Sequence, residues 1–236
     1  MDFEKLSDII KDENRIKIGT DIEDKYLSDA LNRNKGKADV LIFPINTEEV
    51  SRIMKIAYEN GIPVTPRGAG TGLVGATIPT RGGIILDLSL MKNIVELDEN
   101  TLTVTVQPGI LLVDLQKFVE SKGFFYPPDP GEKNASIGGN ISTNAGGMRA
   151  VKYGVTRDYV MGLEVVLADG TILNTGGKVI KNSSGLDIKD LIIGSEGTLA
   201  IITRAILKLI PKPKKSISAI IPFNSLKEGI DTVIKI

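Results

Sequence analysis

Hydrophobic and polar positions along the chain change their period several times, and each period predicts an element of the fold. Between residues 47 and 60 apolar side chains recur at helical spacing, which predicts a helix with one face on a sheet: Val50, Ile53, Met54 and Ala57. This helix is expected to begin at Thr47 in an incomplete capping box and to end at Gly61 as the C′ residue. Short apolar runs at 39–44, 63–67 and 83–88 predict strands, so the region is expected to form a small parallel β-α-β unit.

From Asn93 onward the pattern changes to alternation with period two. Two strands are predicted on either side of a turn at 98–101, and a helix is predicted at 110–122. Residues 160–177 predict a hairpin with Asp169 and Gly170 in a type I′ turn, and 199–210 predicts a long strand. We therefore expect a second subdomain with a mixed or antiparallel sheet and helical insertions.

The two ends of the chain differ from this central region. Residues 2–13 and 21–33 predict two short helices, the second with Asp21 as its N-cap, so 1–35 is expected to be a helical lead-in. A proline- and lysine-rich stretch at 211–215 predicts a stiff linker. Beyond it the pattern predicts one strand and most of one helix, which cannot form a core alone.

Composition excludes several classes of function. The chain has 236 residues, 42% of them hydrophobic and 25% charged, as in a globular protein. Basic and acidic residues both number 29, so no excess charge indicates nucleic acid or an anionic membrane as a partner. No apolar run approaches the length of a membrane span, and the acidic N-terminus is unlike a signal peptide, which favours a cytoplasmic location. With no His and no Cys, histidine-based acid–base catalysis, histidine metal sites, thiolate chemistry and disulfides are excluded within this chain.

A glycine-rich stretch follows the strand predicted at 63–67. Gly70, Gly72 and Gly75 spell G-x-G-x-x-G, the dinucleotide fingerprint, which requires a helix directly after it. Pro79 and the glycines at 82–83 exclude that helix, so we expect a loop between two strands in which backbone N–H groups face an anion. A tight turn without a ligand is the alternative. Arg67 opens the loop, either as a phosphate partner or as a structural arginine.

Two further glycine-rich segments follow. Within 127–147, Asn134 or Ser136 is expected to cap a short helix at 137–141, whose free N–H donors suit a pyrophosphate. A segment at 194–211 sets a glycine turn directly before the last long strand. Three such segments in one domain indicate a single extended nucleotide bound along its length.

In their order and spacing, PRGAGTG, PPDPGEKNASIGGNISTNAGG and SEGTLAIIT resemble the FAD-binding half of a flavoprotein family. This family includes glycolate oxidase D-subunits, D-lactate dehydrogenases, D-2-hydroxyglutarate dehydrogenases and vanillyl-alcohol oxidase. The resemblance spans about residues 36–212 and implies an α+β, two-subdomain PCMH-type FAD-binding fold. It also implies that 213–236 is the truncated start of a substrate-binding cap domain. Relatives with covalent FAD attach it through His or Cys, so here the FAD is expected to be noncovalent.

The resemblance implies three groups of cofactor-binding residues. The first is the loop itself: Pro66, Arg67, Gly68, Ala69, Gly70, Thr71, Gly72 and Leu73. The second lies in and just after 127–147: Pro128, Asp129, Ala135, Ser136, Gly138, Gly139, Asn140, Ser142, Thr143, Asn144, Gly146, Gly147, Tyr153 and Gly154. The third is Glu196, Gly197, Ile201 and Ile202.

Several of these residues have an alternative structural role. Asp129 either touches the ribityl chain or shapes its turn, and residues 142–144 either bind the cofactor or end the helix. Tyr153 lies either beside the flavin ring or in the core. Gly146 and Gly147 are expected to let the backbone approach the cofactor, and Glu196 is expected to be exposed.

The implied function is that of a flavin-dependent 2-hydroxy-acid dehydrogenase or oxidase of the D-lactate or glycolate type, with hydride transfer to the flavin. The base and any metal ligands would come from the cap, so no catalytic residue is assigned and no metal is expected here. The expected partners are a small 2-hydroxy acid and a cap domain or an electron-transfer subunit, with peripheral membrane contact only through partners. A non-catalytic FAD-carrying subunit and an NAD-binding Rossmann enzyme are the alternatives; the residues at 77–83 weaken the second.

Overall fold

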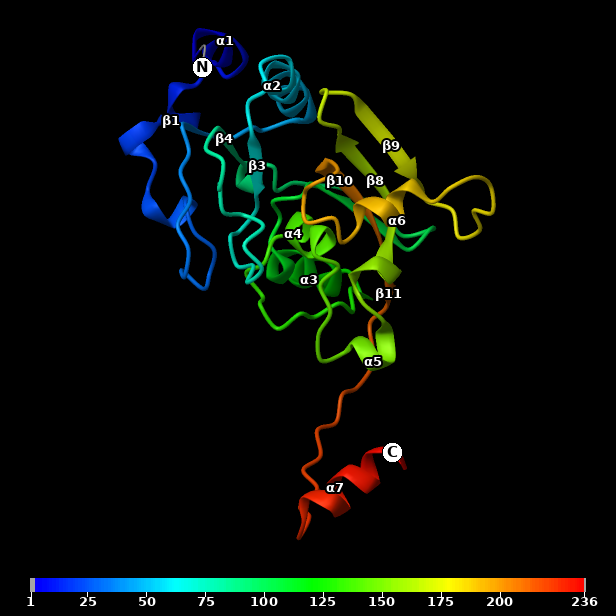
Figure 1. Ribbon diagram of the computed structural model, residues 1–236. Coiled ribbons are helices and arrows are strands. Elements are labelled where there is room, and N and C mark those ends of the chain that lie inside the picture. The colour runs from blue at the N-terminus through cyan, green and yellow to red at the C-terminus, as the bar shows by residue number, and fades with distance from the viewer. Residues whose placement is uncertain (1–2, 236) are drawn as a thin grey trace.

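Two β-sheets of different pairing form the body of the molecule (Figure 1). The structure, a computed structural model, describes residues 3–235. The first sheet has the order β1-β2-β4-β3 and contains β1 (Ile16–Ile18), β2 (Val40–Ile42), β3 (Val64–Arg67) and β4 (Ile84–Asp87). β2, β4 and β3 are parallel, as the pattern predicts, whereas β1 pairs antiparallel with β2.

The second sheet is antiparallel throughout. Its order is β5-β6-β10-β8-β9, with β5 (Ile94–Asp98), β6 (Thr103–Val106), β8 (Val160–Val166), β9 (Ile172–Gly176) and β10 (Ile201–Lys208). A short ribbon joins β7 (Phe124–Phe125) to β11 (Ile210–Pro211). The molecule thus has the α+β, two-subdomain architecture that the sequence predicts.

Helix α2 (Thr47–Glu59) connects the two sheets. Val50, Ile53 and Ala57 are buried on its inner face, at the predicted helical spacing. At the first turn of the same buried face, the Thr47 hydroxyl donates to Glu164 Oε1 on β8 at 2.7 Å. The N-cap is Asn46 and not Thr47, because the Asn46 side chain accepts from the N–H of the third helical residue, at 2.8 Å.

The remaining helices are shorter. They are α1 (Phe3–Ile9), α3 (Leu112–Ser121), α4 (Ile137–Ser142), α5 (Ala150–Tyr153), α6 (Ile188–Ile192) and α7 (Leu226–Val233). Single 3₁₀ turns lie at Glu13–Arg15, Gly19–Asp21, Asp24–Tyr26, Leu88–Leu90 and Thr156–Tyr159. In Figure 1, α3 and α4 lie near the centre of the view, and their buried residues belong to the same core as those of β6, β8 and β10.

The predicted helix at 21–33 is wrong. Asp21 ends one 3₁₀ turn, another spans Asp24–Tyr26, and the chain then runs irregularly to β2. Tertiary contacts override the local pattern here: Ile22 is buried, and the Tyr26 ring packs edge-on against Phe43 at 5.8 Å. The first helix is also shorter than predicted, because the chain turns into β1 after it.

Two other expectations need correction. The hairpin turn is not type I′, since Gly170 has φ +86° but Asp169 does not have a positive φ. The Gly170 N–H donates to the Leu167 carbonyl at 3.0 Å, as in a type I turn followed by a left-handed glycine. The strand predicted beyond the linker does not form, because no other strand in the described residues pairs with it.

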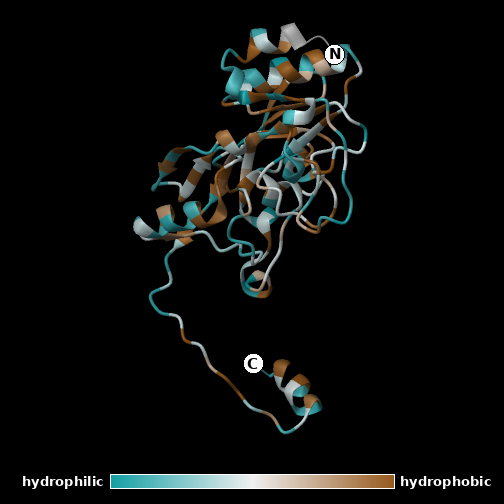
Figure 2. Ribbon diagram, turned by 90° about the vertical axis from the view of Figure 1, so that its left-hand side faces the viewer, coloured by the Kyte–Doolittle hydropathy of each residue, from teal (hydrophilic) through white to brown (hydrophobic). Residues whose placement is uncertain are grey.

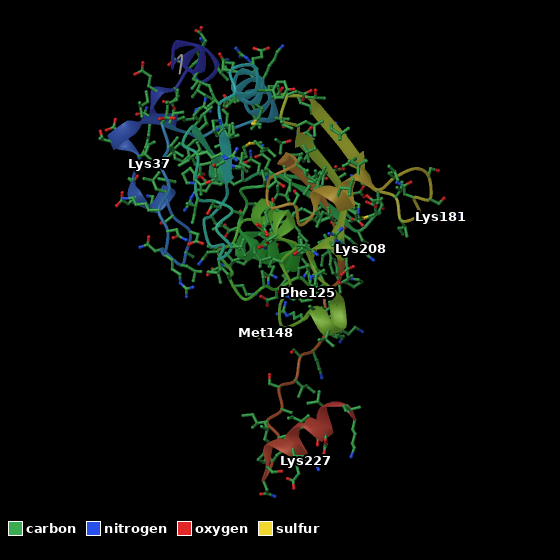
Figure 3. The ribbon with its side chains drawn as sticks, viewed as in Figure 1. Lys37, Phe125, Met148, Lys181, Lys208 and Lys227 are labelled. Carbon is green, nitrogen blue, oxygen red and sulfur yellow. The ribbon has the colours of Figure 1, made fainter. Side chains whose placement is uncertain are left out.

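The C-terminal segment lies apart from the body. After β11 the chain extends away from the sheets, and α7 makes no buried contact (Figures 1 and 2). Lys227 on α7 is well separated from Phe125 and Met148 in the body (Figure 3). Ile217 and Ile220 are 90% and 96% exposed, so the apolar side chains of this segment are left in water.

Candidate cofactor site

A cavity of about 350 Å³ lies where the two sheets and α4 meet. All eight residues of the first loop (66–73) line it. From the other two groups the structure brings to the same cavity Ala135, Ser136, Gly138, Gly139, Asn140, Ser142, Thr143, Glu196, Gly197, Ile201 and Ile202. Three segments far apart in sequence therefore converge on one space.

The first loop joins β3 directly to the strand beside it. No helix lies between β3 and β4 in the structure, so the G-x-G-x-x-G match is not a Rossmann fingerprint. Within the described residues, the N–H groups of Gly70, Thr71 and Gly72 donate to no other group. Consecutive free N–H groups beside a cavity suit an anion.

Two glycines of this loop differ in what surrounds them. A Cβ added to Gly70 would collide with the Arg67 guanidinium, and Gly70 has φ +72°. A Cβ added to Gly72 would meet no atom within 4 Å, and its φ is accessible to any residue. Gly70 is therefore required by the loop itself, whereas only a ligand would require a glycine at position 72.

Arg67 is buried beneath the loop. Its Nη1 donates to the Ser28 carbonyl at 2.9 Å and its Nη2 to the Lys25 carbonyl at 2.7 Å. Burial lowers the pKa of Arg67, and nearby Asp87, Tyr26 and Asp29 oppose this shift, but the guanidinium stays protonated. These contacts support the structural role for Arg67.

Ser136 connects the first loop to α4. As N-cap of α4 its hydroxyl accepts from the Gly139 N–H at 3.3 Å, and it also accepts from the Ala69 N–H at 3.4 Å. A Cβ on Gly68 would collide with this hydroxyl, so the two segments touch. Of the two predicted caps, Ser136 is the one observed.

The third segment is fixed to the end of α4. The N–H groups of Gly194 and Glu196 donate to the carbonyls of Ile141 and Ser142, at 3.1 and 2.8 Å. Glu196 has φ +54° and is exposed, as expected. The second and third walls of the cavity are thus bonded through their main chains.

Seven predicted residues do not line the cavity: Pro128, Asp129, Asn144, Gly146, Gly147, Tyr153 and Gly154. Asp129 is buried and pairs with Lys133 at 2.8 Å and Arg149 at 3.5 Å. Burial raises the pKa of Asp129, but the hydrogen bond and charge of Lys133, with help from Arg149, bring it below the ordinary value. Tyr153 packs edge-on against Phe125, and its carbonyl accepts from the Tyr159 hydroxyl.

The glycines and the asparagine of this second group have local roles. A Cβ on Gly147 would collide with the Asp129 carbonyl oxygen, and a Cβ on Gly154 would collide with Asp158. Asn144 has φ +47°, and its side chain accepts from the Arg157 N–H at 3.0 Å. These contacts account for the residue types without a ligand.

Several cavity residues were not predicted. They are Val74, Ala76, Thr77, Leu88, Pro108, Pro130, Glu132, Ala145 and Ala200. Most are apolar or lie beside predicted positions, so the sequence carries no signal that separates them from core residues. Thr77 is different, because its hydroxyl is buried without a partner.

Two residues of the cavity lining have a polar atom without a partner. Thr77 Oγ1 and Asn140 Nδ2 are buried, and neither has a hydrogen-bond partner among the described residues. Tyr126 Oη and Ser195 Oγ, which lie outside this lining, are also buried without a partner in the described part of the chain. Because most buried polar groups in folded proteins are paired, the two atoms in the lining fit a bound group with donors and acceptors. The apolar side chains of Leu88, Ile201 and Ile202 supply the contact area that a ring system needs.

A second cavity of about 420 Å³ adjoins the first. It lies between α2 and the start of β10, and both cavities are lined by Pro66, Gly197, Ala200 and Ile201. Adjoining cavities suit an elongated ligand. Within the described residues, no group of three His, Cys, Asp or Glu side chains is arranged to hold a metal ion.

Comparison with known proteins shows which family the chain belongs to. The model of a family described as FAD binding domain matches residues 38–176, more than half of the chain. The chain belongs to this FAD-binding domain family. Its cofactor is FAD.

The FAD-binding domain is 50% identical over 209 residues to the glycolate oxidase subunit GlcD of Bacillus subtilis (strain 168), covering 88% of this chain and 44% of that protein. It is 49% identical over 220 residues to a D-lactate dehydrogenase of Anaerostipes hadrus, covering 93% and 46%. The chain therefore spans less than half the length of these relatives. The family resemblance and the flavoprotein class predicted from the sequence are confirmed.

A solved structure confirms the fold. An alkyldihydroxyacetonephosphate synthase superposes with a TM-score of 0.79 at 24% identity, covering 91% of this chain and 42% of that chain. No helix among the described residues has the length and apolar character to cross a bilayer.

Proposed function

We propose that this chain is the FAD-binding part of a flavin-dependent oxidoreductase that oxidises a small 2-hydroxy acid such as D-lactate or glycolate. The observation that carries the proposal is the convergence of the first loop, α4 and the third segment on one cavity with free N–H donors. The names of the two relatives supply the substrate class.

The chain's own residues bind and orient the cofactor. The N–H groups of Gly70, Thr71 and Gly72 suit the diphosphate, and Asn140 and Thr77 offer unpaired polar atoms. When bound, FAD supplies a two-electron acceptor for the hydride of the substrate's α-carbon. No side chain in the described cavity is assigned as the base that takes the hydroxyl proton.

We propose that the FAD is held noncovalently, because the chain has no His or Cys to attach it. Acid precipitation of the FAD-loaded protein should release all flavin into the supernatant. Flavin retained in the washed pellet would contradict this.

We further propose that residues 213–236 belong to a second domain of the kind that the longer relatives possess. The apolar side chains of α7 are exposed here, and α7 buries no residue against the body. The same domain would supply the substrate-binding groups. An FAD-carrying subunit without its own substrate site is a second candidate, favoured by the word "subunit" in the name of the Bacillus relative.

A chimaera tests the proposed reaction. In it, this chain replaces the matching 209 residues of the Bacillus relative, and the native relative is the control. The proposal expects anaerobic bleaching of the flavin by glycolate or D-lactate but not by L-lactate. A chimaera that binds FAD as the native protein does but is bleached by no 2-hydroxy acid would contradict it.

A further inference from the structure

The first loop lies on a buried arginine. The Arg67 side chain is 7% exposed, and its guanidinium lies between the main chain at Gly70 on one side and the segment 24–30 on the other. The same segment is tied to the loop a second time, because the Ala30 N–H donates to the Gly72 carbonyl at 3.2 Å. Segment 24–30 therefore forms the outer support of the loop, although it precedes the part of the chain that the family model matches.

The charge of Arg67 is not neutralised by an ion pair. Among the described residues, no carboxylate oxygen lies within 4.0 Å of its guanidinium nitrogens. Its terminal nitrogens donate instead to two neutral carbonyls, and the Tyr26 ring lies 5.7 Å from the guanidinium carbon. Asp87, its register partner on β4, and Asp29 are close enough to stabilise this charge, although neither is within ion-pair distance. Because a buried cation is costly to desolvate, an anion bound beside the loop would add to this stabilisation.

Arg157 is the natural comparison within the same chain. Its guanidinium also donates to two main-chain carbonyls, those of Asp190 and Ile193 at 2.7 and 2.8 Å, and so fixes the chain just before the third segment. Unlike Arg67, it has a carboxylate partner, Asp190, at 3.6 Å. The two arginines share a bonding pattern and differ in whether their charge is paired.

We propose that Arg67 is a positioning residue for the cofactor diphosphate: it holds segment 24–30 against the first loop, and its unpaired positive charge is matched by the diphosphate bound on the other side of that loop. This inference rests on the proposed binding of FAD at this cavity. The inference adds to the proposed FAD binding a reason why the site would prefer FAD to an uncharged flavin. It assigns that preference to Arg67, a residue that need not touch the ligand.

The test measures two affinities for each protein, one for FAD and one for riboflavin, which lacks phosphate. Arg67→Met should lower the ratio of FAD to riboflavin affinity by about tenfold or more, because the lost charge acts only on the diphosphate. Arg157→Met is the matched control, because it also removes two hydrogen bonds from a guanidinium to main-chain carbonyls and one formal positive charge. It should leave the ratio of FAD to riboflavin affinity unchanged. Raising the ionic strength should weaken FAD binding by the wild type more than riboflavin binding.

The conservative variant separates charge from folding. Arg67→Lys keeps the charge and loses the two-carbonyl geometry, so it should weaken FAD and riboflavin binding together and keep their ratio. If Arg67→Met does not fold, as judged by circular dichroism, Arg67→Lys decides: a retained ratio supports the proposal, and a ratio that falls about tenfold overturns it.

An unchanged ratio in a folded Arg67→Met protein would also overturn the proposal. Equal losses of ratio in Arg67→Met and Arg157→Met would do the same, since they would trace the effect to general distortion of the cavity. A wild-type chain that binds neither flavin would instead contradict the proposed function itself.

Discussion

The first loop and the segment 127–147 are both rich in glycine, yet Gly72 in the loop differs from Gly138 and Gly147 in the segment. In the first loop, the position where a Gly72 Cβ would lie is empty space beside the cavity. In the second segment, a Cβ on Gly138 would press on Pro108 at 2.7 Å, and one on Gly147 would collide with the Asp129 main chain. The comparison shows that a glycine motif marks close approach of the backbone, but not whether it approaches a ligand or another part of the chain.

The largest effect on binding is expected from Gly72→Val. The change adds a branched side chain where only the cavity is open, so stability should be kept while FAD affinity falls about a hundredfold or more through loss of charge-assisted N–H contacts. Fluorescence titration with FAD measures the loss. Gly177→Val is the matched control, because Gly177 also has open space around it but lies outside the cavity. Equal FAD affinity in the two variants would contradict the prediction that Gly72 faces the ligand.

Gly147→Ala should have the opposite profile. Its Cβ would meet the Asp129 carbonyl, so the free energy of unfolding should fall by about 1–3 kcal/mol. Urea denaturation measures this. Gly146→Ala, whose Cβ would meet only the Val155 side chain at 3.3 Å, should cost less. A fully stable Gly147→Ala protein that has lost FAD binding would show that Gly147 faces the ligand after all.

Ser136→Ala affects both segments at once. It removes the N-cap of α4 and the acceptor for the Ala69 N–H, which should cost about 0.5–2 kcal/mol of stability and weaken FAD binding. Ser225→Ala removes the equivalent cap from α7 and should leave FAD binding unchanged. Thermal unfolding with and without FAD distinguishes the two; identical FAD affinities would mean that Ser136 acts on α4 alone.

The smallest effect is expected at Asp129. Its lowered pKa means that its carboxylate stabilises the fold above about pH 4 and that this contribution is lost as the pH falls through the folded-state pKa. Because Lys133 and Arg149 are partly exposed, Asp129→Asn should cost about 1 kcal/mol or less at pH 7, and this cost should shrink as the pH falls below about 4. Unfolding free energies measured from pH 7 downward test this, and a difference that does not shrink below about pH 4 would contradict the ion-pair explanation.

Much of the fold could be predicted from the sequence where neighbouring residues determine the structure. The periodicity of α2, the pairing of 63–67 with 83–88 and the absence of a helix after the first loop all follow from residue order. The helix predicted at 21–33 failed because Arg67 takes the carbonyls of Lys25 and Ser28, a contact between positions about forty residues apart. The prediction of a type I′ turn at Asp169 was wrong because Gly170 follows a type I turn and is not part of a type I′ turn.

The predicted site residues were likewise correct in one segment and partly wrong in another. Every predicted residue of the first loop lines the cavity, whereas Asn144, Gly146 and Gly147 do not. The glycine content of both segments predicts that their backbones approach other atoms closely. Which atoms lie opposite each glycine depends on the tertiary fold, and the sequence alone does not predict it. Thr77 carries no motif, and only its burial without a partner identifies it.

A crystal structure of this chain with FAD would show directly where the diphosphate binds. We expect diphosphate oxygens within hydrogen-bond distance of the N–H groups of Gly70, Thr71 and Gly72, with Arg67 still bonded to the carbonyls of Lys25 and Ser28. A diphosphate bound elsewhere, with these three N–H groups facing solvent, would contradict it.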